Sequence, residues 1–184
     1  MLLQYETNRL ILKVLGPDSA KEVLQFYEED KELFERYEID RCPQFYTESH
    51  QRNILQVEYG LTLKMSLIRY YVFLKEKPDD IIGTISLYDV STPFARADIG
   101  YKFASRYHHQ GYASEAVEKL IDIAFTELKL HRICARVQEE NFPSIRLIEG
   151  LGFEKEGVCR HYMRMRGQWM DHLQYSLIAP ESFS

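Results

Sequence analysis

The sequence has few cysteines and no long apolar run, and these absences narrow the class of protein. Cysteine occurs only three times, at Cys42, Cys134 and Cys159. Because the number is odd and no CxxC or Cys/His metal spacing is present, we expect three reduced thiols and no metal site. No run of about 18 apolar residues exists, and charges near the start replace the apolar core of a signal peptide. We therefore expect a protein of the reducing cytoplasm that does not enter a membrane.

The chain also lacks a large excess of one charge sign and the common glycine motifs for phosphate binding. Its net charge of −5 at pH 7 argues against nucleic acid as a partner and is compatible with a cationic substrate such as an amine. Neither the P-loop pattern nor the dinucleotide pattern GxGxxG occurs. Because no repeat or linker interrupts its 184 residues, we expect a single domain over residues 1–184.

Apolar periodicity and turn residues divide the chain into strands and helices. The pattern predicts strands at residues 9–15, 70–75, 81–88, 95–103, 132–137, 158–165 and 170–178. It predicts helices at residues 20–27, 30–37, 47–65, 113–129 and 141–152. Residues 77–80, Lys-Pro-Asp-Asp, are predicted to form the turn between the second and third of these strands. This order predicts an α+β, or mixed α/β, fold with one central, largely antiparallel sheet.

The most informative segment joins the strand that ends near Phe103 to the most regular helix of the sequence. A short polar loop leads to Gly111, Tyr112 and Ala113 at the helix start. Unpaired backbone N–H groups and the positive end of the helix dipole lie there, and small residues let a phosphate approach the backbone. A structural interpretation is also open, because Gly111 permits a tight turn and Ala113 permits close helix–sheet packing.

This loop resembles the acetyl-CoA motif of the GCN5-related N-acetyltransferases, the GNAT superfamily. That motif has Gln or Arg, two residues, Gly, one residue, and Gly or Ala. The chain has His108-His109-Gln110-Gly111-Tyr112-Ala113, with His108 in place of Gln or Arg. Further segments resemble the ribosomal-protein-alanine N-acetyltransferase (Rim-type) subgroup in the same order: residues 7–10 (TNRL), 97–101 (ADIGY), 141–144 (NxxS), 152–157 (GFxxEG) and 167–177 (GxxxDxxxYxL). The resemblance covers nearly the whole chain.

The resemblance implies a GNAT fold whose central sheet is flanked by helices and splayed at the cofactor strand, residues 99–103. It also implies that acetyl-CoA is the acyl donor. The pantetheine arm would pair with backbone groups of the splayed strand, as an added strand does. The donor-binding residues that the resemblance implies are Tyr101, Lys102, Phe103, His108, His109, Gln110, Gly111, Tyr112, Ala113, Ser114, Asn141 and Ser144.

The implied reaction is direct attack of a neutral primary amine on the thioester. A tetrahedral oxyanion forms, and a backbone N–H near Tyr101 or Lys102 would stabilise it. The departing CoA thiolate then needs a proton. The resemblance implies Ser144 as the donor, because Ile148 occupies the position where many relatives have a tyrosine acid.

The general base has two candidates, Asp98 in the splayed strand and Asp171 in the last hairpin, acting directly or through a water. Each carboxylate also has a structural interpretation, as a group that ties strands together. Asn141 and Ser144 likewise fit the start of a helix as capping residues. Glu115, in the first turn of its helix, is interpreted as structural because a carboxylate there favours the helix dipole.

The acceptor amine has two alternatives: the N-terminal α-amine of a protein, as in the Rim-type subgroup, or a small amine such as a polyamine, an amino acid or an antibiotic. The acidic residues 28–49 are expected to form one wall of the acceptor site, although such a run also fits a solvated helix face. A different class of function remains open, a non-catalytic sensor that binds acyl-CoA. The resemblance is also compatible with a homodimer.

Overall fold

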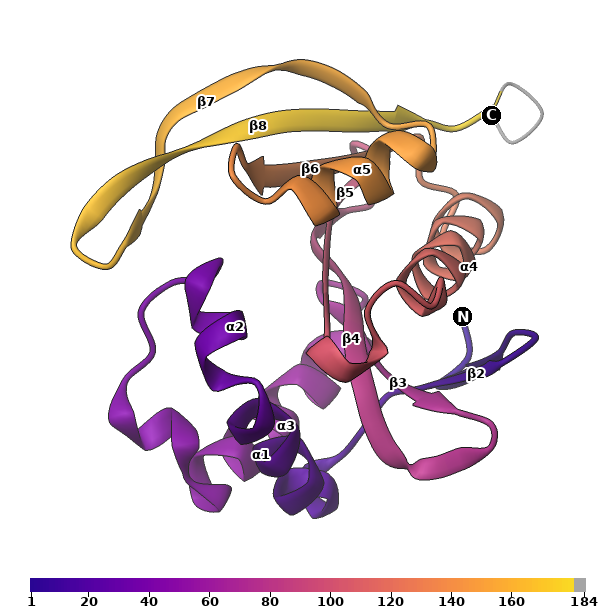
Figure 1. Ribbon diagram of the computed structural model, residues 1–184. Helices are drawn as coiled ribbons and strands as arrows, with labels where there is room; N and C mark the ends of the chain where they lie inside the picture. The colour runs from indigo at the N-terminus through magenta and orange to yellow at the C-terminus, as the bar shows by residue number, and fades with distance from the viewer. Residues whose placement is uncertain (181–184) are drawn as a thin grey trace.

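The protein, seen here in a computed structural model that describes residues 1–180, is built on one eight-stranded sheet (Figure 1). The strand order is β1-β2-β3-β4-β5-β6-β8-β7. Every described pair is antiparallel except β5 with β6. The strands are β1 (Gln4–Glu6), β2 (Leu10–Lys13), β3 (Ile68–Leu74), β4 (Lys77–Ser91), β5 (Arg96–Phe103), β6 (Arg132–Gln138), β7 (Glu154–Met165) and β8 (Gln168–Ile178). The predicted fold class, a mixed and mostly antiparallel sheet with flanking helices, is confirmed.

Helices cover both faces of this sheet. They are α1 (Ala20–Glu29), α2 (Lys31–Arg36), α3 (Glu48–Leu63), α4 (Tyr112–Thr126) and α5 (Phe142–Gly150). Short 3-10 turns lie at η1 (Pro17–Ser19), η2 (Pro43–Tyr46) and η3 (Ser105–Tyr107). In Figure 1 the first three helices gather at one side of the molecule, while α4 and α5 lie at another.

Side-chain alternation along the central strands explains the two layers. In β3, Tyr70 and Val72 are buried in the core that contains α4 and α5, whereas Tyr71 and Phe73 are buried in the second core with α1, α2 and α3. Successive side chains of a strand point to opposite faces, so a strand covered on both sides reads as one continuous apolar run. The predicted apolar stripe of α4 is buried in the first of these cores.

Local capping signals fix the ends of α5. The Asn141 side-chain carbonyl accepts a hydrogen bond from the Ser144 N–H at 3.3 Å, so the predicted cap is confirmed. At the other end Gly152 has a φ of +86°, which favours glycine, and its N–H donates to the Glu149 carbonyl at 3.1 Å.

The predicted turn at residues 77–80 is wrong. The chain reverses one step earlier, at Lys75 and Glu76, and residues 77–80 already belong to β4. Pairing jumps there from Phe73 with Ile81 to Leu74 with Lys77, so residues 78–80 form an irregularity in the ladder. Pro and Asp suit such a bulge as well as a turn, because neither needs a regular ladder partner.

The feature that positions the site is a split between β5 and β6. The two strands pair only where residues 96–98 face residues 132–134. Beyond Asp98, β5 stays paired with β4 as far as Phe103, while β6 continues on β8. Residues 99–103 of β5 therefore have one edge without a strand partner within residues 1–180, as the sequence predicts for the splayed strand.

Candidate active site

Two hydroxyl groups meet across this split. The Tyr101 hydroxyl, from the free part of β5, lies 2.7 Å from the Ser144 hydroxyl in the first turn of α5. It also donates to the Ser144 backbone carbonyl at 3.2 Å. Burial raises the pKa of Tyr101 to about 12, although its hydrogen bond with Ser144 acts in the opposite direction. The phenol is therefore protonated at neutral pH and holds Ser144 at the mouth of the split.

The start of α4 has the properties that an anionic donor requires. Gly111 has a φ of +78°, and no side chain caps the helix, so the first-turn N–H groups of Tyr112, Ala113 and Ser114 stay available. A Cβ at Gly111 would come to 3.3 Å from the Arg9 guanidinium in addition to the unfavourable φ. This backbone cradle fits the pyrophosphate of acetyl-CoA, and the CoA thioester would supply the acyl group.

Polar side chains of the preceding loop turn back onto the protein. The His108 ring Nε2 lies 2.9 Å from the Phe103 carbonyl, and the Gln110 amide donates to the Arg106 carbonyl at 3.0 Å. His109 is exposed and has a φ of +60°. These contacts shape the loop, and donor binding by the three side chains remains a prediction.

Sequence reasoning missed a clasp that joins the start of the chain to this loop. Glu115 accepts hydrogen bonds from the Thr7 hydroxyl at 2.5 Å, the Arg9 N–H at 2.9 Å and the Arg9 guanidinium at 2.6 Å. Arg9 also donates to the Gln110 carbonyl at 2.9 Å, and its guanidinium stacks on Tyr112 at 4.5 Å. The segment TNRL was visible in the sequence, but nothing local in it indicates a partner more than a hundred residues away.

This clasp determines the charge state of Glu115. Partial burial alone raises the pKa of its carboxyl, but the hydrogen bonds from Thr7 and Arg9 outweigh burial and lower it overall. The ionised carboxylate therefore anchors the first turn of α4. The structural interpretation of Glu115 agrees with these contacts.

Asp98 lies at the point where β5 and β6 part. Its side chain is buried and forms an ion pair with Arg136 of β6. The Arg136 guanidinium also stacks on Tyr162 of β7 at 5.0 Å. The ion pair ties the two strands together below the split, and a role for Asp98 as base remains a prediction.

Asp171 contacts a different part of the hairpin. It is exposed, and its carboxylate accepts a hydrogen bond from the His161 N–H at 2.8 Å. His161 has a φ of +49° and lies in a register shift of β7 against β8. This contact supports the bulge of the hairpin, and the role of Asp171 as base also remains a prediction.

The strand register assigns Asp98 and Tyr101 to opposite faces of the sheet. Ile99, Tyr101 and Phe103 face the core under α4 and α5. Asp98 and Lys102 point to the other face, because side chains alternate along a strand. The Lys102 ammonium forms an ion pair with Glu38 there and lies 5.1 Å from the Tyr27 ring. Only the backbone of Lys102 is thus available for its predicted contact with the donor.

This second face is polar near the split. Six of the eight polar side chains buried within residues 1–180 are on it, by the pairing of β4, β5, β6 and β8. They are Thr84, Ser86, Asp98, Gln138, His172 and Ser176. Most of these groups have hydrogen-bond partners within the protein, which compensates their burial, and together they make this face polar beside the split.

Sequence reasoning singled out only Asp98 in this set, and His172 is the titratable member that it missed. Its ring packs 5.1 Å from the Tyr162 ring, and it pairs in register with Gln138 of β6. Burial lowers the pKa of His172, and the nearby Arg136 adds to this effect. The ring is therefore neutral at pH 7.

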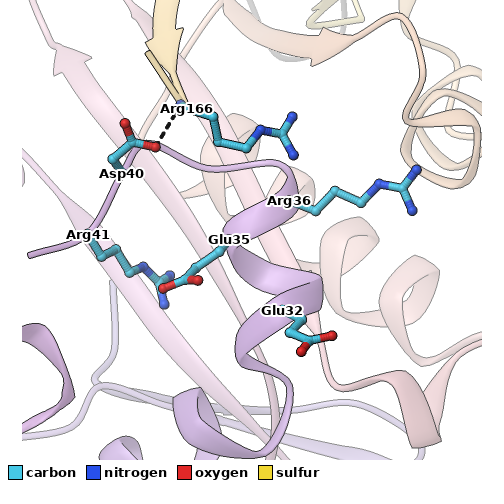
Figure 2. Close-up of a pocket in the computed structure, with 6 residues that line it drawn as sticks. All are labelled: Glu32, Glu35, Arg36, Asp40, Arg41 and Arg166. Atoms are coloured by element: carbon cyan, nitrogen blue, oxygen red, sulfur yellow. Dashed lines mark hydrogen bonds between the residues drawn. The ribbon is translucent and has the colours of Figure 1, made fainter. Parts of the chain in front are cut away.

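A cavity of about 490 Å³ opens beside this face, between α2 and the tip of the β7–β8 hairpin (Figure 2). The Asp40 carboxylate accepts a hydrogen bond from the Arg166 N–H at 2.7 Å and thus joins the two sides. In Figure 1 the hairpin curves toward α2 in the same way. The cavity is lined by Glu32, Glu35, Arg36, Asp40, Arg41 and Arg166.

The described residues contain no group of three or more His, Cys, Asp or Glu side chains suited to a metal ion. None of the helices within residues 1–180 is both long and apolar enough to cross a membrane.

A split parallel strand pair beside an uncapped, glycine-started helix is the arrangement that the resemblance to acyl-CoA-dependent acyltransferases implies. Residues 9–154 match the model of the acetyltransferase (GNAT) domain, and the chain belongs to this family of N-acetyltransferases. It is 37% identical, over 95% of its length and 96% of the relative, to the uncharacterized N-acetyltransferase p20 of Bacillus licheniformis.

Solved structures agree with this assignment. The ribosomal-protein-S5-alanine acetyltransferase of Vibrio fischeri superposes with a TM-score of 0.91 at 26% identity, and the alignment covers 100% of both chains. RimJ of Mycobacterium smegmatis, solved in complex with CoA-disulfide, has a TM-score of 0.86 at 24% identity over 92% of this chain and 82% of that one. The resemblance to the Rim-type subgroup is confirmed, and the protein is an N-acetyltransferase.

Proposed function

We propose that the protein transfers the acetyl group of acetyl-CoA to the α-amine at the N-terminus of a peptide or protein. The observation that carries this proposal is the split between β5 and β6, with a free strand edge on one side and the Tyr101–Ser144 pair bridging it. The relative from Vibrio fischeri, named for alanine acetylation of a ribosomal protein, supports this acceptor over a small amine.

Donor binding would use the backbone more than side chains. The free edge of residues 99–103 offers N–H and C=O groups to the amides of pantetheine. The N–H groups of Tyr112, Ala113 and Ser114 would hold the pyrophosphate. Asn141 already caps α5, so its contact with the donor would add to a structural role.

In the reaction, the amine nitrogen attacks the thioester carbonyl carbon and forms the new C–N bond. An N–H near Tyr101 or Lys102 would stabilise the oxyanion, and such donors contribute about 10²–10³ in rate. The cationic nitrogen of the intermediate gives a proton to Asp98 or to water. The C–S bond then breaks, the thiolate takes a proton from the Ser144 hydroxyl, and the proton released from the nitrogen finally restores the Ser144–Tyr101 pair. The Tyr101 hydroxyl, 2.7 Å away, orients Ser144 and can return the proton to it.

Two faces of the sheet would hold the two substrates. Ser144 and Tyr101 belong to the face under α4 and α5, where the thiol would lie. Asp98 and Lys102 belong to the polar face, from which the amine would approach. An α-amine has a pKa near 7.7–8.0 and needs little help to become neutral. Because Asp98 lies on the polar face from which the amine would approach, it is a better-placed base than the exposed Asp171, whose carboxylate supports the hairpin bulge.

The test is acetyl-CoA turnover measured by release of free CoA thiol with a panel of N-terminal peptides and small primary amines. We expect micromolar binding of acetyl-CoA by calorimetry, no comparable binding of ATP, and turnover with the peptides. Turnover with small amines alone would overturn the acceptor class. Binding of acetyl-CoA without turnover of any amine would favour the sensor alternative.

A further inference from the structure

Some of the charged side chains that line the cavity between α2 and the hairpin already have hydrogen-bond or ion-pair partners, and others do not. Tyr46 donates to the Glu35 carboxylate at 2.7 Å, and the Asp40 carboxylate is bonded to the Arg166 N–H. Arg41 is paired with Glu38 and stacks on the Phe45 ring at 4.1 Å. These contacts hold the walls of the cavity together, and each of these carboxylates keeps further acceptor positions.

Two guanidinium groups differ from this pattern. Within the described part of the chain, no carboxylate lies at ion-pair distance from the Arg36 or Arg166 side chain. Figure 2 shows both side chains extended from opposite walls and directed to the same side of the cavity. Glu32 is the one carboxylate of the lining without a hydrogen bond or ion pair among residues 1–180. The lining side chains carry three negative and three positive charges, so Arg36 and Arg166 differ from the rest by their unengaged N–H donors and not by an excess of positive charge.

The cavity adjoins the reaction site through a short ion-pair chain. Glu38, which comes after α2 in the chain, pairs with both Arg41 of the cavity lining and Lys102 of β5. Burial alone raises the pKa of the Glu38 carboxyl, but Lys102 and Arg41 outweigh it and lower the pKa. The ionised Glu38 side chain thus lies between the cavity and the free part of β5.

We propose that Arg36 and Arg166 bind a carboxylate of the acceptor, so that the preferred acceptor is a peptide with an acidic residue shortly after its reactive N-terminus. This inference rests on the proposed acetyl transfer to an N-terminal amine and adds to it the chemistry of the next few residues of the peptide. The acidic residues 28–49, which the sequence predicts to form one wall of the acceptor site, would favour the cationic amine itself. The free N–H donors of the two arginines would select the side chains of the peptide that follow its amine.

The arrangement has a physical rationale. An arginine presents a planar fork of donors that matches a carboxylate, and it stays charged at all relevant pH values. Both side chains are exposed, so each contributes to encounter and selectivity more than to tight binding. The fixed hydrogen bond from the Arg166 N–H to Asp40 keeps the second guanidinium on the hairpin tip opposite α2.

The experiment compares three hexapeptides that share the first residue and carry Glu, Gln or Lys at the third and fourth positions. kcat/KM is measured with saturating acetyl-CoA for the wild type, Arg36→Gln, Arg166→Gln and the double variant. The matched control is Arg164→Gln, which removes another exposed arginine of the same hairpin whose guanidinium donates to the Gly167 carbonyl at 3.5 Å.

We expect kcat/KM of the wild type to be about tenfold higher for the Glu peptide than for the Gln peptide. In each single arginine variant this ratio should fall by about threefold. The preference should shrink when ionic strength rises. The Gln peptide should be used equally well by all variants, which shows that they fold and bind donor. The Arg164→Gln control should retain the wild-type preference.

Equal use of all three peptides by the wild type would overturn the inference and leave the proposed acetyl transfer standing. A preference for the Glu peptide that survives in the double variant would overturn the assignment to Arg36 and Arg166. Turnover of no peptide, together with turnover of small amines, would instead overturn the proposed acceptor class on which the inference rests.

Discussion

Removal of the charge on Glu115 should weaken binding of the complete donor and spare a donor that lacks the pyrophosphate. The variant is Glu115→Gln, which keeps the shape of the side chain and removes the anion that Thr7 and Arg9 clasp. The loop at residues 108–113, which is proposed to bind the pyrophosphate, contacts this clasp directly through the hydrogen bond from Arg9 to the Gln110 carbonyl and the stacking of Arg9 on Tyr112. Loosening the clasp should therefore let the loop leave the conformation in which the backbone N–H groups at the start of α4 can bind an anion.

The magnitude is set by the contacts of Glu115. Hydrogen bonds to a charged group contribute about 1.5–3 kcal/mol each when buried, but the Arg9 side chain is 48% exposed, so its ion pair has only the small value of a surface pair. The hydrogen bonds from the Thr7 hydroxyl and the Arg9 N–H dominate. Both donate to the same Glu115 oxygen, which glutamine can retain, but a neutral amide accepts them more weakly and places its own N–H donors against the Arg9 guanidinium. We expect a loss of about 1.5 kcal/mol, roughly a tenfold rise in KM for acetyl-CoA.

The assay measures KM and kcat for acetyl-CoA and for S-acetyl-pantetheine, which lacks the pyrophosphate and nucleotide. We expect the tenfold rise for acetyl-CoA only, with kcat nearly constant for both donors. Glu118→Gln, on an exposed residue of the same helix, is the matched control and should behave as the wild type. If KM rose equally for both donors, or for neither, an action of the clasp through the loop at residues 108–113 would be refuted.

Further variants test the rest of the site. Ser144→Ala should lower kcat by about 10²-fold with little change in KM for acetyl-CoA, and Tyr101→Phe should lower kcat by about tenfold. The double variant should have nearly the kcat of Ser144→Ala alone, because Tyr101 acts through Ser144; additive losses in the double variant would disprove this shared role. Gly111→Ala should raise the dissociation constant of CoA at least tenfold by calorimetry, because its φ of +78° is strained for alanine; unchanged affinity would count against the backbone cradle. Since His172 has a lowered pKa, the unfolded state binds more protons below about pH 6.5, so chemical denaturation should show stability falling from pH 7 to pH 5.5. His172→Gln should flatten that part of the profile, and an unchanged slope would assign it to other groups.

Features set by neighbouring residues in the chain were predictable from the sequence. The apolar stripe of α4, the Asn141 cap and the terminating Gly152 depend on side chains within a few positions of one another. The free edge of residues 99–103 was anticipated through the family resemblance, since periodicity gives a strand but says nothing of where its partner ends. The turn at residues 77–80 failed because the same Pro-Asp residues also suit a bulge.

Contacts between residues distant in sequence were not predictable. The Glu38–Lys102 pair and the Thr7–Glu115 hydrogen bond depend on which elements the fold brings together. A carboxylate in an acidic stretch gives no sign that it will be partly buried beside a lysine of β5. For the same reason the sequence suggested a generally acidic acceptor wall, whereas the fold engages several of these carboxylates and leaves Arg36 free to bind a ligand.

The alternation of β5 accounts for the arrangement of the whole site. A strand paired on both edges would separate the side chains of its two faces completely, with Tyr101 on one and Lys102 on the other. Where β6 departs, the backbone between them is exposed on one edge, and groups from the two faces can meet only there. By the proposed mechanism, a thioester held along that edge would be reached from the Ser144 face by a proton and from the polar face by an amine. Any variant that extends β5–β6 pairing past Asp98 should therefore abolish transfer while leaving the fold intact, which hydrogen exchange of residues 99–103 together with turnover would measure.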